Sequence, residues 1–253
     1  MNTCRILGVH FCVTTLEEAS DWIIMHRREA AGEYISLCNV HTTVMAMEDP
    51  DYLEAENRAV LTLPDGKPIV TEERKRGFPD AERTGGPDLM DAVFRKTSKG
   101  QKGEGLRHYF YGSSPEVLQA LQEKLPGKYP GIIIAGALSP PFRALSAKEE
   151  EEIREKISAA APDIIWVGLG APKQEKWMLR HRGIFNGIMI GVGAGFDFHA
   201  GTKKRAPVWM QRASLEWLYR LMQEPGRLFG RYFHSNTSFL LKVGKDRRQE
   251  RTK

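Results

Sequence analysis

Short runs of apolar and β-branched residues alternate along this chain with stretches in which apolar residues recur at helical spacing. The runs predict strands at residues 5–13, 34–39, 59–63, 107–111, 131–135, 163–168 and 187–192. The helical stretches lie at residues 15–30, 41–57, 86–97, 115–125, 146–160 and 173–182. This repeated order predicts an α/β fold: a mostly parallel, Rossmann-like sheet with helices on both faces and a ligand site at the carboxyl ends of the strands.

Two of these helices have marked starts. Ser114 precedes Pro115, and Ser146 stands three residues before Glu149, the spacing of a capping box. All predicted strands end before the last fifth of the chain. We therefore divide the chain into an α/β core at residues 1–200, of one or two lobes, and a helical, basic C-terminal appendage at residues 201–253. Residues after Asn236 are expected to be of low order, with the last ones disordered.

Charge separates these two parts clearly. Residues 202–253 hold 13 Lys and Arg against 4 Asp and Glu, whereas residues 1–201 hold 24 against 28. A positive block at one end of a chain indicates an anionic partner: nucleic acid, a membrane surface or phosphorylated substrates. No window approaches the roughly 18 apolar residues of a membrane-spanning helix, and a signal-peptide layout is lacking. We expect a cytoplasmic, globular protein, and a homo-oligomer is compatible with the sequence.

Candidate metal ligands are few. Cys4, Cys12 and Cys38 lack the paired spacing of a zinc site and lie in apolar runs, which predicts buried structural cysteines. Asp49 and Asp51 formally match the Asp-x-Asp pair of metal-dependent sugar transferases. A proline between them indicates a helix break, so we interpret these carboxylates as helix caps and expect no metal site.

Polar residues and glycines gather where the predicted strands end. Asp65 stands between a proline and a glycine, in a turn that either points its carboxylate into a cleft or caps the next helix. The segments GLGAP at residues 168–172 and GVGAGFD at residues 191–197 offer close backbone approach and free amides for an anion. Neither has the third glycine of a dinucleotide fingerprint, because Lys173 and Phe196 occupy those positions.

Four segments in order, PDGKPIV, GLGAPKQEKW, GVGAGFDFHAGTKKRAP and LEWLYRLMQEPGRLFGRYF, resemble the signature of the WecG/TagA/CpsF glycosyltransferase family. The resemblance extends from about Ile6 to Phe239. It implies an inverting enzyme, without metal or other cofactor, that transfers a sugar, often N-acetylmannosamine, from a UDP donor to a polyprenyl-pyrophosphate-linked sugar. It also implies cell-envelope or exopolysaccharide synthesis at the inner face of the cell membrane, with peripheral attachment to that anionic surface.

The resemblance also assigns roles to single residues. Asp65 matches the family's candidate base, which takes the proton of the acceptor hydroxyl during inverting transfer. Asn39 matches an asparagine of the donor pocket, and Arg83 an arginine that holds a donor or acceptor phosphate. The family often has a threonine two residues before that asparagine, where this chain has Leu37; whether Ser36 supplies the hydroxyl stays open.

The glycine loops are then expected to close over the donor. The remaining candidate substrate contacts in the core are Gly168, Gly170, Gln174, Glu175, Gly193 and Asp197. In the appendage, Arg220, Arg227 and Arg231 are expected to neutralise the leaving diphosphate, because guanidinium groups match phosphate oxygens. Apolar residues beside these arginines form either a core helix or a surface that meets lipid. The basic run at residues 203–205 faces either solvent or an anionic partner.

Two other functions remain open at this point. A nucleic-acid-binding protein explains the basic tail, although no interleaved aromatic or recognition pattern accompanies it, and we expect no nucleic-acid partner. A nicotinamide-dependent oxidoreductase explains the glycine loops but not the tail. Titration with UDP, NAD and a short duplex distinguishes the three functions.

Overall fold

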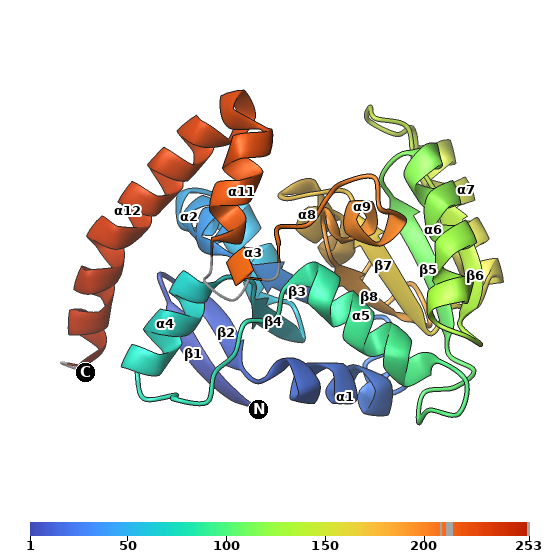
Figure 1. Ribbon diagram of the computed structural model, residues 1–253, viewed down its shortest axis with the longest axis horizontal. Helices are drawn as coiled ribbons and strands as arrows, with labels where there is room; N and C mark the ends of the chain where they lie inside the picture. Colours follow the sequence, from blue (N-terminus) through green and yellow to red (C-terminus); the bar gives the residue numbers. More distant parts are fainter. Residues whose placement is uncertain (208, 211–214, 252–253) are drawn as a thin grey trace.

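The computed structural model describes residues 1–207, 209–210 and 215–251, except for the side chains of residues 227 and 249–251. Its centre is a six-stranded parallel sheet in the order β4-β3-β8-β7-β5-β6 (Figure 1). The strands are β3 (Tyr34–Cys38), β4 (Leu61–Pro64), β5 (Arg107–Gly112), β6 (Ile133–Leu138), β7 (Ile164–Gly168) and β8 (Ile188–Gly191). The predicted α/β fold is confirmed.

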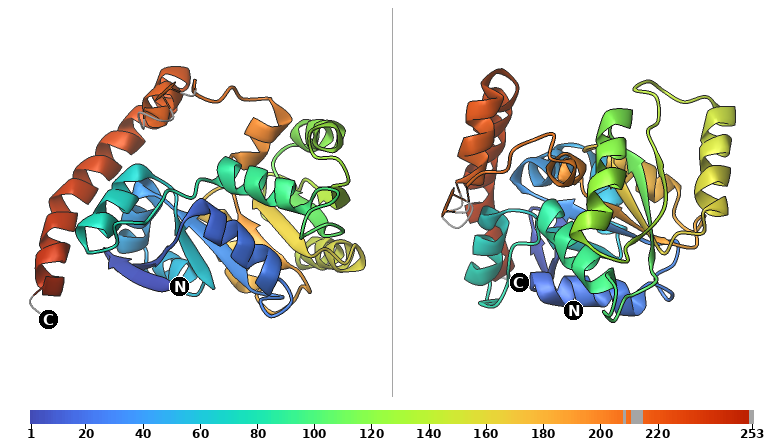
Figure 2. Two further views of the ribbon diagram at one scale, coloured as in Figure 1. Left: turned by 60° about the horizontal axis from the view of Figure 1, so that its bottom comes forward. Right: turned by 45° about the vertical axis from the view of Figure 1, so that its right-hand side comes forward.

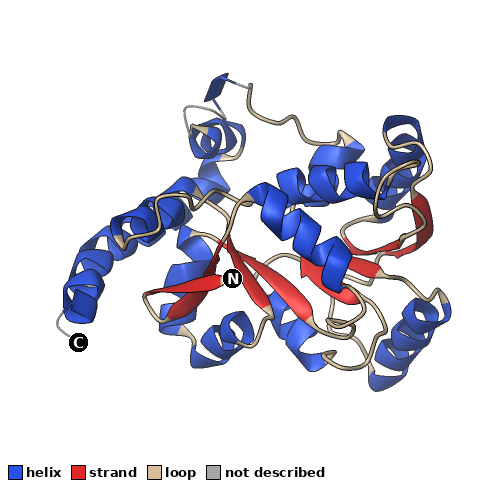
Figure 3. Ribbon diagram, turned by 90° about the horizontal axis from the view of Figure 1, so that it is seen from below, coloured by secondary structure: helices blue, strands red, loops and turns tan. Residues whose placement is uncertain are grey.

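Helices cover both faces of this sheet because successive strand residues point to opposite sides and both sides are apolar. Ile164 and Trp166 of β7 pack into one layer, and Ile165 and Val167 into the other. The first layer contains α1 (Leu16–His26), α5 (Gly86–Thr97), α6 (Pro115–Lys128) and α9 (Gly195–Ala200). The second contains α7 (Ala147–Ala159) and α8 (Lys173–Arg180), with α3 (Pro50–Asn57) against α8 and α2 (Val40–Glu48) against α3 (Figure 3).

We predicted a single strand at residues 5–13, but this apolar run forms most of a two-stranded hairpin. β1 (Asn2–Ile6) and β2 (Val9–Val13) pair antiparallel in a separate two-stranded sheet. Leu7 and Gly8 join them with φ values of 50° and 92°. Positive φ at both central residues is typical of a type I′ turn, whose twist suits a two-residue hairpin. The apolar Leu7 hides this turn in the sequence.

Other boundaries differ for local reasons. The predicted helix at residues 41–57 divides because Asp49 Oδ1 accepts hydrogen bonds from the amides of Asp51 and Tyr52 and starts α3. The strand predicted at 131–135 lies instead at Ile133–Leu138. Helix α4 (Lys67–Lys75) was not expected, since its only buried apolar residues, Ile69 and Val70, make a short pattern. The predicted caps are confirmed: the hydroxyl of Ser114 starts α6, and a capping box starts α7.

The C-terminal part consists of α11 (Glu216–Gln223) and α12 (Pro225–Arg251). Figures 1 and 2 show α12 running along the side of the core, next to α2 and the β1–β2 hairpin. Phe239 and Val243 are buried in a cluster with residues of β1 and α2. This packing corrects the expectation of low order after Asn236: the helix continues to Arg251 because its inner face is apolar at helical spacing. Residues 252–253 lie outside the described part.

Candidate active site

The carboxyl ends of four neighbouring strands carry four of the predicted site residues. Asn39 follows β3, Asp65 follows β4, Gly168 closes β7, and Gly193 stands two residues after β8. The sheet places β4, β3, β8 and β7 side by side in that order. Because parallel strands end at the same edge, these residues share one edge of the sheet, which is where α/β folds bind their ligands.

Asp65 lies where β4 ends and α4 begins. Its amide donates a hydrogen bond of 2.9 Å to the carbonyl oxygen of Cys38 at the end of β3. Helix α4 starts at Gly66 without a side-chain cap, so the carboxylate of Asp65 is not the helix cap that the sequence left open. Oδ1 instead lies against Gly85 at the start of α5, where a Cβ atom would stand 3.2 Å away. The carboxylate therefore lies at the carboxyl edge of the sheet, next to the start of α5.

The surroundings of Asp65 change its acidity. The side chain keeps some access to solvent, but protein atoms crowd the carboxyl on most sides. Burial raises the pKa of Asp65, and the positive charges of Arg83 and Arg220 oppose this rise. A carboxylate with a raised pKa beside cationic groups has the properties of a general base that works near neutral pH.

Arg83 belongs to a group of four charged residues that we name the charge ring. Arg83 donates to Asp88 Oδ2 at 2.6 Å and to Glu216 Oε2 at 3.1 Å. Arg205 closes the ring, donating to Asp88 Oδ2 at 2.7 Å and to Glu216 Oε1 at 3.2 Å. The ring thus links the core, which supplies Arg83 and Asp88, to α11, which supplies Glu216. It brings Arg83 beside Asp65, since both side chains contact the position of Gly85.

Three members of the charge ring were not among the predicted site residues. Asp88 stands in the first turn of α5, where a carboxylate is common for reasons of helix capping and dipole. Arg205 was noted only as part of the basic run at residues 203–205, and it pairs with carboxylates of the protein rather than facing solvent. Glu216 had no sequence signal. Lys203 of the same run pairs with Glu224 at 3.3 Å.

Asn39 combines a local role with its place at the edge. Its Oδ1 accepts hydrogen bonds from the amides of His41 and Thr42, so it caps α2. Its Cβ stands 3.8 Å from the position a Cβ would take on Gly66, next to Asp65. Ser36 does not substitute for a hydroxyl at this edge, because its Oγ is fully buried and donates to Glu56 Oε2 at 2.7 Å.

The two glycine loops lie against each other. A Cβ on Gly168 would stand 3.3 Å from the carbonyl oxygen of Gly193 and 2.9 Å from the ring of Phe196. Gly170 and Gly193 have φ values of 76° and 51°, which favour glycine, and a Cβ there would meet no atom within 4 Å. These positions combine an unusual backbone with open space, as expected where a ligand approaches the backbone closely.

Gln174 and Glu175 lie beneath these loops rather than on their surface. Gln174 is 3% exposed; its Oε1 accepts from the amide of Gly193 at 2.9 Å, and its Nε2 donates to Glu175 Oε1 at 2.9 Å. Glu175 is 1% exposed, and burial together with the neighbouring Glu56 raises its pKa to about 8. In this structure, the two side chains support the loop around Gly193 from inside.

The appendage arginines occupy different places. Arg220 lies 5.9 Å from the ring centre of Phe198 in α9. Burial raises the pKa of Asp65, and the charge of Arg220 opposes this rise. Arg231 is exposed on α12 beside α2. Burial lowers the pKa of His41 in α2 to about 4, and the charge of Arg231 adds to this effect. The side chain of Arg227 lies outside the described residues. Asp197 lies in the first turn of α9, and its Oδ1 accepts from Thr202 Oγ1 at 3.5 Å.

Asp49 and the three cysteines were the candidate metal ligands of the sequence. Asp49 is a helix cap, as interpreted from the sequence, and its Oδ2 also pairs with Lys176 at 2.7 Å. Cys4, Cys12 and Cys38 are buried, as predicted. Within the described residues, no three His, Cys, Asp or Glu side chains are grouped as metal ligands. None of the described helices is long and apolar enough to cross a membrane.

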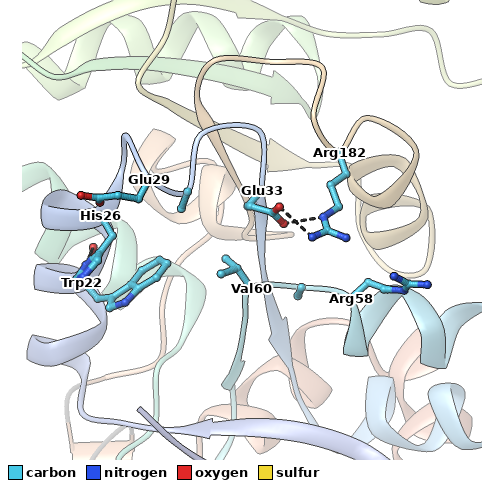
Figure 4. Close-up of a pocket in the computed structure, with 9 residues that line it drawn as sticks. Trp22, His26, Glu29, Glu33, Arg58, Val60 and Arg182 are labelled. Carbon is cyan, nitrogen blue, oxygen red and sulfur yellow. Dashed lines mark hydrogen bonds and ion pairs between the residues drawn. The ribbon is translucent and has the colours of Figure 1, made fainter.

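A hollow of about 400 Å³ opens at the opposite, amino-terminal edge of the sheet (Figure 4). Trp22 and His26 of α1 lie on one side of it, and Arg182 lies on the other, where it forms two hydrogen bonds to Glu33. Val60, just before β4, lies between them. None of the predicted site residues lines this hollow, so the candidate site is defined by the chemistry of the carboxyl edge and not by cavity size.

A parallel α/β sheet with glycine loops and an arginine-flanked aspartate at its carboxyl edge is typical of enzymes that bind phosphorylated ligands. Comparison with known proteins makes the class specific. The model of the glycosyl transferase WecG/TagA/CpsF family matches residues 4–253. The chain belongs to this family and is a glycosyltransferase.

Three relatives from Bacillus and Staphylococcus carry the same name, N-acetylglucosaminyldiphosphoundecaprenol N-acetyl-beta-D-mannosaminyltransferase. The chain is 34% identical to the Bacillus spizizenii protein of that name over 197 residues, covering 78% of this chain and 73% of the relative. It is 31% identical to the Bacillus subtilis protein over 229 residues, covering 90% and 86%. It is 30% identical to the Staphylococcus aureus protein over 253 residues, covering 98% and 95%.

Proposed function

We propose that this chain transfers N-acetylmannosamine, or a similar sugar, from a UDP donor to a sugar linked to polyprenyl pyrophosphate, with inversion at the anomeric carbon. The activity named for the relatives supports the sugar and the acceptor. The product then enters the synthesis of a cell-envelope polymer. Those names give a β-linked sugar but not the donor; the UDP donor and the inversion come from the resemblance to the family.

One observation carries the mechanism: the Asp65 carboxylate, unused as a helix cap, lies at the carboxyl edge of the sheet beside Arg83, where the charge of Arg220 also acts on it. In the proposed reaction, an acceptor hydroxyl oxygen attacks the anomeric carbon while Asp65 takes its proton. The bond between that carbon and the diphosphate oxygen breaks, and UDP leaves with the electron pair. Cationic groups stabilise the charge that develops on this leaving group.

Arginines take the part that a metal has in other sugar transferases. Arg220 is positioned at the edge and Arg83 beside Asp65, and both present forked donors that suit phosphate oxygens. Asp49 of the Asp-x-Asp pair caps α3 and forms an ion pair with Lys176, so its carboxylate already has protein partners. We therefore propose transfer without a metal. Excess chelator should leave the rate unchanged; complete loss, restored by manganese or magnesium, contradicts this part.

The apolar residues of α11 and α12 support attachment to a membrane surface. Trp217, Met222, Phe229 and Phe233 are 48–68% exposed, beside Arg220 and Arg231. Exposed apolar side chains among cationic groups are typical of helices that lie at an anionic lipid surface. We propose peripheral binding at the inner face of the membrane, where the acceptor lipid is presented.

Mass analysis of products tests the function directly. The protein is incubated with a prenyl-pyrophosphate-linked N-acetylglucosamine and each member of a panel of UDP-sugars. We expect a disaccharide product with UDP-N-acetylmannosamine and an inverted anomeric configuration by NMR. Product from a different sugar alone corrects the donor, retention of configuration contradicts the role of Asp65, and no product with any UDP-sugar contradicts the donor class.

A further inference from the structure

Two carboxylates already bind Arg83 in this structure. Nη2 lies 2.6 Å from Asp88 and Nη1 lies 3.1 Å from Glu216. A guanidinium offers five donors in one plane, and the two carboxylates occupy one donor on each terminal nitrogen. A diphosphate that binds both terminal nitrogens as a fork therefore competes with these partners for Arg83. The state of the charge ring therefore determines how readily an anion binds beside Asp65.

The two carboxylates are held with different strength. Arg205 contacts both oxygens of Asp88 at 2.7 Å, and Asp88 belongs to α5, whose inner face is buried in the core. Glu216 has the longer contacts, 3.1 Å to Arg83 and 3.2 Å to Arg205. It belongs to α11, none of whose residues is buried. Glu216 is therefore the partner that an entering anion displaces.

Charge balance leads to the same conclusion. With two arginines and two carboxylates the ring is neutral, and it offers a diphosphate no net attraction. Without Glu216 the remaining three side chains carry one positive charge. Both ring carboxylates also raise the pKa of Asp65, so an anion in place of Glu216 preserves the electrostatic environment of the base.

We propose that the Glu216 carboxylate occupies the anion site of Arg83 and competes for it with a substrate diphosphate, so that diphosphate binding and the Glu216–Arg83 contact exclude each other. This inference rests on the proposed function and adds a regulatory contact to the same site. The diphosphate belongs either to the donor nucleotide or to the prenyl-linked acceptor. Displacing Glu216 also breaks a link between α11 and the core, which couples substrate binding to the appendage.

Calorimetric titration of the full chain tests this competition. Glu216→Gln removes the charge and keeps the shape, and Glu224→Gln, which pairs with Lys203 in the same appendage, is the matched control. Each protein is titrated with UDP, with geranyl diphosphate and with uridine, which has no phosphate. We expect Glu216→Gln to bind at least one diphosphate about three- to tenfold more tightly, the range for removing one competing, partly exposed charge. Uridine binding and the control variant should not change.

The outcomes separate the two proposals. Equal or weaker binding of both diphosphates by Glu216→Gln overturns the inference, as does an equal gain in Glu224→Gln. Absence of diphosphate binding by every protein overturns it as well, because a vacated Arg83 should then accept the anion. A gain for geranyl diphosphate with no UDP binding by any protein supports the inference while contradicting the proposed donor. Thermal unfolding of each variant identifies a loss caused by misfolding, and Glu216→Asp, which restores the charge, should return the affinity toward that of the wild type.

Discussion

The α/β core and the C-terminal appendage bury their side chains in different ways. Every residue of β3 and β8 is buried between two helical layers, whereas no residue of α11 is buried. Helix α12 contacts the core through buried residues that include Ser235, Phe239 and Val243. The core is therefore a rigid support for chemistry, and the appendage is attached by a seam and a few ion pairs that can be exchanged.

The outer face of α12 sharpens this difference. Phe229, Phe233 and Leu240 are 65–71% exposed, although Leu228 and Phe239, which precede two of them directly, are buried. A helix in a folded protein usually has one apolar face, and a second one indicates a further contact. The appendage thus combines an inner face that the core covers with an outer face that suits lipid, whereas both faces of the core sheet are covered.

The largest effect is expected in the core. Asp65→Asn should lower the transfer rate by about 10² to 10⁴, because the base is lost while the shape is kept. Its unfolding temperature should not fall, since the change removes a carboxyl whose ionisation burial opposes. Product formation by mass analysis measures the rate, with Asp51→Asn, on the exposed start of α3, as control. A rate above about a tenth of wild type rules out this base.

The pH dependence of the rate tests the same residue. Burial raises the pKa of Asp65, so the acidic limb of the rate profile should lie above the ordinary range of an aspartate and the rate should fall as pH decreases through it. Removing Arg220, whose positive charge lowers this pKa, should move the limb to higher pH. An acidic limb that stays in place in Arg220→Gln contradicts the proximity of these two groups. Rate profiles at saturating substrate provide the measurement.

The seam between the two regions should respond next. Phe239 is 3% exposed and packs among residues of β1 and α2, so Phe239→Ala should reduce the free energy of unfolding by about 3 kcal/mol. Leu240→Ala is the matched control, because the neighbouring Leu240 is 71% exposed and should have an effect below about 0.5 kcal/mol. Denaturant titration measures both. Equal effects would mean that α12 does not rest on the core through Phe239.

A buried acid near the seam gives a smaller, pH-dependent effect. Both carboxylate oxygens of Glu73 in α4 are buried without a hydrogen-bond partner among the described residues, and burial raises its pKa to about 8. Since the folded state holds this proton more tightly than the unfolded state, the contribution to stability is present below pH 4.5 and is lost as pH rises through about 8. Glu73→Gln should therefore stabilise the protein by about 1–3 kcal/mol at pH 8 and by less at pH 5.

Denaturant titrations of wild type and Glu73→Gln at both pH values measure this difference. The exposed Glu155 of α7 provides the control, because its replacement by Gln should not produce a pH-dependent difference. If the difference in the free energy of unfolding between wild type and Glu73→Gln is the same at pH 5 and pH 8, Glu73 is not a buried, protonated acid.

The sequence predicts the core well because its signals are local. Apolar runs mark the six strands of the parallel sheet, and the residues that follow them, Asn39, Asp65 and Gly193, reach one edge by geometry alone. Local signals fail where contacts are distant. The charge ring joins Arg83 to Glu216, and nothing near either residue indicates the other. Glu175 was expected to contact the substrate, and no local signal predicts its place in the interior near Glu56.

The appendage was predicted less completely for the same reason. Its helical nature and charge are visible in the sequence, but the polar segment after Asn236 gives no sign of order. Order there depends on Phe239 and Val243 meeting a surface built by β1 and α2, and on the ion pair of 2.8 Å between Asp246 and Arg76. Long-range packing of this kind overrides a weak local pattern.

The smallest effect on stability, and a distinct effect on membrane binding, is expected at the outer face of α12. Phe233 is 68% exposed, so Phe233→Ser should change the free energy of unfolding by less than about 0.5 kcal/mol. The same change removes apolar area from the surface that we propose meets lipid, and binding to vesicles with anionic headgroups should weaken several-fold. Sedimentation with vesicles of phosphatidylglycerol measures this, and wild-type binding should also weaken as salt screens the basic residues. Unchanged vesicle binding by Phe233→Ser, Phe229→Ser and their combination would show that the outer face of α12 does not bind lipid. The core and the appendage would then differ only in how α12 packs on the core.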